Sequence, residues 1–135
     1  MNPSSALLFQ NDETFTNRPQ LAEAYHQLFA LRAELSDTLH ADQLRPILDL
    51  AWGRAVRITS ALDELSELPA LTAVQENQIG RAVLMAGQLL SQCLLLPDQQ
   101  ESEPALRGRI ELARAMVTPL LEAGKRVDES LTGRT

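Results

Sequence analysis

Apolar residues recur between positions 44 and 65 at alternating steps of four and three. The residues in this row are Leu44, Leu48, Ala51, Ala55, Ile58, Leu62 and Leu65. This spacing constrains the fold strongly, because a helix that carries such a stripe must bury it against neighbouring helices. The row predicts a helix over about 43–67, with Asp42 as its N-cap and Pro69 beyond its end.

Three further segments carry stripes of the same kind and predict helices over about 18–39, 73–96 and 103–131. In the first the apolar positions are Leu21, Tyr25, Leu28, Leu35 and Leu39, with Ala24 and Leu31 beside them. In the second they are Ile79, Val83, Ala86, Leu90 and Cys93. In the third they are Leu106, Ile110, Ala113, Val117, Leu120, Gly124, Val127 and Leu131. Thr72 with Gln75 predicts a capping box, Ser102 predicts an N-cap, and Pro119 is expected to kink the last helix.

Short polar connections separate these four segments, and no segment has the strict alternation of a half-buried strand. The predicted fold class is therefore all-α, an antiparallel up-down-up-down four-helix bundle with a short N-terminal arm. The expected divisions are an arm over 1–16, the bundle over 17–131 and a tail over 132–135. We expect the arm to fray unless its Leu and Phe residues dock on the chain's own core or on another subunit.

The charge balance argues against binding to nucleic acid through basic groups. Asp plus Glu is 18 and Lys plus Arg is 12, which gives a formal net charge of −6. No apolar run approaches the length of a membrane span, and no basic region followed by an apolar core stands at the start. We therefore expect a cytoplasmic protein that binds neither membrane nor nucleic acid.

No set of residues predicts catalysis or metal binding. Glu23 with His26 and Asp37 with His40 have the spacing of a ligand pair, but both pairs lie on one predicted helix, whereas di-iron bundles need such pairs on two helices. Cys93 is the single cysteine and lies on an apolar stripe, where a buried thiol is expected. The sequence assigns no catalytic, metal-binding or cofactor-binding residue, and the expectation leans toward a protein that is not an enzyme and has no cofactor.

Arg32 is the clearest charge on a predicted apolar stripe. One interpretation is that its aliphatic stem packs while its guanidinium reaches solvent. The other is a buried or interfacial pairing with a carboxylate, for which Glu76 and Asp128 are candidates, or a grip on an anionic ligand.

Arginines and the single Trp gather in the second predicted helix. Arg45, Trp52, Arg54 and Arg57 are candidates for an interaction or anion-binding surface, because Arg and Trp are enriched at the energetic centres of interfaces. Ordinary solvated flanks are the alternative.

Gly80 and Gly87 lie seven residues apart inside a predicted helix, and each costs about 1 kcal/mol of helix stability relative to Ala. They are candidates for close contact with a helix outside the four-helix core, and a ligand cavity is the weaker alternative.

Together these observations favour a non-enzymatic, self-associating helical bundle that acts through protein–protein interaction, as an adaptor, regulator or assembly factor. We expect a homo-oligomer, a dimer first of all, and a further protein partner of unknown identity. Leu84, Leu89, Leu94, Leu95, Leu112 and Leu121 are the apolar residues that one stripe per helix does not use. The alternative is a small-molecule-binding or catalytic bundle that holds an anionic ligand between helices.

Overall fold

Four α-helices make up most of the computed structural model, which describes residues 18–36, 38–94 and 102–132. They are α3 (Pro19–Glu34), α4 (Leu44–Leu65), α5 (Ala73–Leu94) and α6 (Glu103–Thr132), and the short 3₁₀ helix η1 (Ala41–Gln43) precedes α4. No strand occurs in these ranges. The predicted all-α fold with four helices is confirmed. The predicted arm, residues 1–16, lies outside the described residues.

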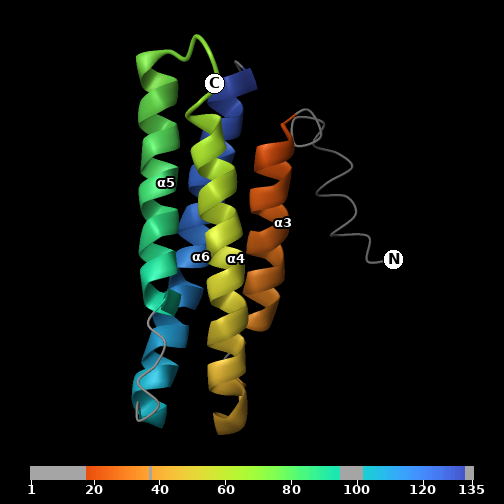
Figure 1. The fold of residues 1–135 in the computed structure, drawn as a ribbon, viewed down its shortest axis with the longest axis vertical. Coiled ribbons are helices and arrows are strands. Elements are labelled where there is room, and N and C mark those ends of the chain that lie inside the picture. The colour runs from red at the N-terminus through yellow and green to blue at the C-terminus, as the bar shows by residue number, and fades with distance from the viewer. Residues whose placement is uncertain (1–17, 37, 95–101, 133–135) are drawn as a thin grey trace, which may run out of the picture.

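The helices lie side by side and the chain runs alternately up and down, as Figure 1 shows. Each helix packs on the next one in the sequence, and α3 also packs on α6, so the four helices close into a bundle. None of the described helices combines the length and the apolar character that crossing a membrane requires.

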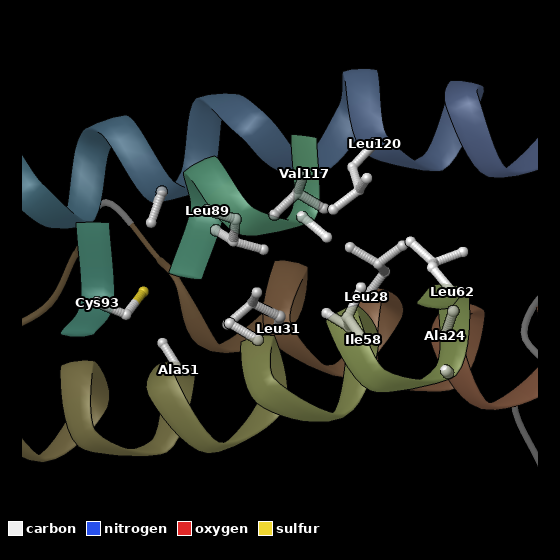
Figure 2. Close-up of a cluster of buried hydrophobic side chains, with 14 of the residues drawn as sticks. Ala24, Leu28, Leu31, Ala51, Ile58, Leu62, Leu89, Cys93, Val117 and Leu120 are labelled. Atoms are coloured by element: carbon white, nitrogen blue, oxygen red, sulfur yellow. The ribbon is translucent and has the colours of Figure 1, made fainter. Parts of the chain in front are cut away.

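One apolar core runs the length of the bundle, with side chains from all four helices. Figure 2 shows Leu28 and Leu31 of α3 facing Ile58 of α4, with Leu89 of α5 and Val117 of α6 above them. Each of these side chains is at most 2% exposed. The seven predicted positions of α4 are all buried, and in α6 every predicted position is buried except Leu131, which is half-buried.

The buried stripe of α5 differs from the predicted one at two positions. Ala82 and Leu89 are fully buried, whereas Val83 and Leu90 are only half-buried. The helix packs against α4 on one flank and α6 on the other. At 100° per residue, the mean direction of its buried positions lies about 40° from that of the predicted ones.

α3 ends at Glu34, five residues before the predicted end. The reason lies in the polar residues that follow. The Ser36 hydroxyl oxygen accepts a hydrogen bond from the backbone N–H of Thr38 at 3.1 Å and lies 2.8 Å from the Thr38 hydroxyl. Such local bonds from Ser and Thr compete with the helical hydrogen bonds of the backbone.

The helix starts follow the predicted capping residues in two of three cases. In the capping box, the Thr72 N–H donates to Gln75 Oε1 at 2.8 Å and the Gln75 N–H donates to Thr72 Oγ1 at 3.1 Å. The Ala105 N–H donates to Ser102 Oγ at 3.3 Å. The expectation for Asp42 is wrong, because Asp42 lies inside η1, which continues directly into α4.

Side chains tie the helix ends together at both ends of the bundle. Where α6 ends, Arg18 Nη2 donates to the Leu131 carbonyl oxygen at 2.7 Å, and Gln75 Nε2 donates to that of Ser130 at 3.1 Å. At the opposite end, Arg107 Nη1 donates to the Leu39 carbonyl oxygen at 3.0 Å.

Tyr25 and Gly124 fix how closely α3 approaches α6. The Tyr25 hydroxyl donates to the Leu121 carbonyl oxygen at 3.3 Å, and a Cβ added at Gly124 would lie only 3.3 Å from that hydroxyl oxygen. A side chain at position 124 would force the ring to shift.

Candidate interaction surface

Arg54 joins α3 to α4 through three hydrogen bonds. Its Nε and Nη2 donate to the two carboxylate oxygens of Glu34 at 2.7 and 2.6 Å, and its Nη1 donates to Gln27 Oε1 at 2.8 Å. Gln27, only 3% exposed, in turn donates to Glu23 Oε1 at 2.9 Å. The hydrogen bonds to Glu34 raise the pKa of Arg54 above its ordinary value. We call Glu23, Gln27, Glu34 and Arg54 the α3–α4 polar network.

The other members of the predicted arginine cluster do not gather around Arg54. Trp52 is 41% exposed, and because it precedes Arg54 by two residues it points about 200° away around the helix. Arg45 is half-buried. Arg57 is exposed and forms no hydrogen bond or ion pair with any described residue. The structure therefore divides the predicted set between different flanks of α4.

Part of that set lines a shallow hollow of about 260 Å³ on the outer side of α4. Its lining residues are Gln27, Asp49, Leu50, Gly53, Arg54 and Arg57. Arg54 is bound to Glu34, and Asp49 also lines the hollow, where its carboxylate repels an incoming anion. This hollow is consequently a weak candidate for anion binding.

Arg32 is exposed, with its guanidinium at the surface as in the first of its two interpretations and not in a buried pairing among the described residues. Its guanidinium carbon lies 4.9 Å from the centre of the Phe29 ring, a cation–π contact on the surface of α3. Arg32 forms no hydrogen bond or ion pair with any described residue, so neither Glu76 nor Asp128 pairs with it. The buried part of α3 instead extends toward Gln27, on the flank that faces α4.

Gly80 and Gly87 lie on the outer side of α5. A Cβ added at either position would meet no atom within 4 Å, so no helix of this bundle approaches them closely. The space that they leave open is on the surface, and the predicted contact with a helix outside the bundle stays a prediction.

A groove between α5 and α6 has a volume of about 420 Å³. Its lining residues are Gln78, Arg81, Leu84, Met85, Gln88, Ala123 and Arg126. We call it the α5–α6 groove. Leu84 is 65% exposed, the highest fraction among the large hydrophobic residues of the described chain.

The polar groups of this groove have no partners among the described residues. Arg81 and Arg126 are exposed and form neither a hydrogen bond nor an ion pair there, and no carboxylate lines the groove. Gln78 Oε1 is buried and accepts no hydrogen bond from any residue that the structure describes. The groove therefore offers an apolar surface and two positive charges to a molecule that would enter it.

Sequence reasoning found only part of this groove. Leu84 stood out as an apolar residue beyond the predicted stripe, and it is exposed, as is Leu112. Leu89 belongs to the core instead, and Leu121 is half-buried. Leu95 and the side chain of Leu94 lie outside the description. Arg81 and Arg126 gave no signal, because they lie 45 residues apart and meet only through the α5–α6 contact.

Cys93 is fully buried, as predicted, and its chemistry follows from burial. Loss of solvation raises the pKa of its thiol to about 11, although the nearby positive charge of Arg109 lowers it. Such a thiol stays protonated near neutral pH and is a poor nucleophile. Within the described ranges, no group of three or more His, Cys, Asp and Glu side chains could hold a metal ion.

Comparison with protein-family models, with curated proteins and with solved structures gives no match to this chain.

Proposed function

We propose that this chain is a non-enzymatic helical-bundle protein that acts through protein–protein interaction, self-association included, and that the α5–α6 groove is its binding surface. The observation that carries the proposal is the exposed Leu84 in a groove that it shares with two arginines, which have no partner among the described residues. Exposed apolar residues beside Arg are typical of interface centres.

The chemistry of the groove indicates what kind of surface would bind there. Arg81 and Arg126 would each form charge-assisted hydrogen bonds with a partner carboxylate, while Leu84 and Met85 would lose their contact with water. Acidic residues outnumber basic ones in this chain, 18 to 12, so a second copy can supply such carboxylates.

The test is the mass of the full chain in solution, measured by light scattering up to high micromolar concentration. We expect the wild type to exceed the monomer mass of 14.9 kDa and Leu84→Glu to shift toward it. Val74→Glu is the matched control, because Val74 lies on the same helix, is 62% exposed and does not line the groove. A wild type that stays monomeric, or an equal loss of mass in both variants, would contradict self-association through this groove.

The volume of the groove favours one second candidate, a small organic anion held by the same two arginines. About 420 Å³ lies within the usual range of ligand pockets. A thermal-shift screen with organic phosphates and carboxylates tests this function. Stabilisation of a monomeric wild type that disappears in Arg81→Ala and in Arg126→Ala would favour the small molecule over the protein partner.

A further inference from the structure

The chain itself contains a segment whose chemistry matches the α5–α6 groove. Residues 6–15 begin with Ala6-Leu7-Leu8-Phe9, continue to Asp12 and Glu13, and end at Phe15. No Lys or Arg occurs before Arg18 in the sequence, so the segment has no basic residue of its own to offset these two acidic residues. The segment thus carries apolar side chains beside two negative charges, and the groove carries Leu84 and Met85 beside two positive ones.

The position of Arg18 places the groove within reach of this segment. Arg18 lies where α6 ends, because it donates to the Leu131 carbonyl oxygen, and α5 begins at the same end, where Gln75 donates to Ser130. Gln78 and Arg126 are about one helical turn from these two contacts. In Figure 1, α3 begins, α6 ends and α5 begins toward the same, upper end of the bundle.

The length of chain between the two charges and Arg18 is sufficient. Five residues from Glu13 to Arg18 span up to about 16 Å when extended, and packed helices lie about 8–10 Å apart. The chain therefore needs to cross the end of one helix, α6, to bring Asp12 and Glu13 to Arg126.

We propose that residues 6–15 occupy the α5–α6 groove of their own chain, with Asp12 and Glu13 facing Arg81 and Arg126. This inference rests on the proposed function, because it takes the groove as the binding surface. It adds regulation to that function, since the segment and a partner compete for the same residues.

The first experiment is limited proteolysis of the full chain with chymotrypsin, following cleavage after Phe9 and Phe15. We expect the double variant Arg81→Glu/Arg126→Glu to be cleaved at least about tenfold faster than the wild type, because like charges expel the segment. Adding Asp12→Arg and Glu13→Arg to that variant restores opposite charges and should restore slow cleavage. Arg57→Glu is the matched control, an exposed arginine outside the groove that should leave the rate unchanged.

Equal cleavage rates in the wild type and the double variant would overturn the inference, as would a failure of the compensating charges to restore protection. Protection that increases with protein concentration would place the segment on a second copy and overturn docking within one chain. The two proposals can be distinguished. Rapid cleavage in the wild type would show that residues 6–15 do not occupy the groove. If the molecular mass still falls in Leu84→Glu and not in Val74→Glu, the proposed function is nevertheless supported.

Discussion

The α3–α4 side of the bundle and the α5–α6 side each contain arginines and a glutamine, but these residues are in opposite states. In the α3–α4 polar network, Arg54 makes three hydrogen bonds and Gln27 joins it to Glu23. In the α5–α6 groove, Arg81 and Gln78 make none with the described residues. A group that the fold already satisfies stabilises the fold, whereas an unsatisfied group is available to another molecule. Arg54 is therefore a structural residue, whereas Arg81 is a candidate for binding.

Removal of Arg54 should destabilise the protein far more than removal of Arg81. Arg54→Ala leaves the half-buried carboxylate of Glu34 and the buried amide of Gln27 without their donors, and should cost about 2–4 kcal/mol of unfolding free energy. Arg81→Ala removes an exposed side chain without a described partner and should stay within about 0.5 kcal/mol of the wild type. Urea unfolding at pH 7 measures both. Equal costs would show that the two arginines do not differ in structural role.

The buried thiol of Cys93 in the core makes the free energy of unfolding depend on pH. Burial raises the pKa of Cys93 to about 11 from an ordinary value of 9.0, so the folded state holds the thiol proton more tightly than the unfolded state. Stability is therefore retained below pH 9 and should fall by about 2–3 kcal/mol as the pH rises through 11. Urea unfolding between pH 7 and 11 should show a flatter pH dependence in Cys93→Ala. The same slope in that variant would assign the loss to other groups.

Substitution of Gln27 and of Gln78 should have smaller effects on stability, and these should differ in sign. Gln27→Leu leaves one N–H of Arg54 without its acceptor and should destabilise the fold by about 1–2 kcal/mol. Gln78→Leu removes an acceptor that has no described donor and should be neutral or slightly stabilising, by up to about 1 kcal/mol. Thermal unfolding of both variants gives the two signs. Destabilisation by Gln78→Leu equal to that of Gln27→Leu would show that Gln78 has a partner in solution.

Substitution of the two glycines on the outer side of α5 should change stability least. Gly80→Ala and Gly87→Ala should each stabilise an isolated chain by about 0.5–1 kcal/mol, because Ala favours the helix and its Cβ meets no atom within 4 Å. Each variant is measured at low and at high protein concentration. A gain at low concentration that turns into a loss at high concentration would support the predicted contact of these glycines with another chain.

The spacing of apolar residues predicted the helices well, because burial on one face requires that spacing. All seven predicted positions of α4 are buried, and its observed bounds lie within two residues of the predicted ones. The end of α3 was predicted less well. Leu35 and Leu39 continue the helical spacing past Glu34, but the hydrogen bonds between Ser36 and Thr38 end the helix, and spacing contains no information about them.

The candidate site was less predictable because its residues come together only across helices. A helical wheel placed Arg32 on the apolar stripe, yet it cannot show how far the neighbouring helices cover the stripe's edge. The pairing of Arg54 with Glu34 depends on how α3 and α4 are aligned along their axes. The α5–α6 groove depends in the same way on the alignment of Arg81 with Arg126, which one helix considered alone does not define.

The early end of α3 also gives the bundle two unequal ends. At 16 residues α3 is about 24 Å long, against about 45 Å for the 30 residues of α6, so at the lower end in Figure 1 α4 and α6 extend beyond it. There the irregular chain around Leu39 takes the place of a helical turn, held by its hydrogen bond from Arg107. Residues covered by such a segment open to solvent without the whole bundle unfolding. Amide protons near Ile110 should consequently exchange with solvent faster than those near Leu120, and the bundle should lose its order from this end first.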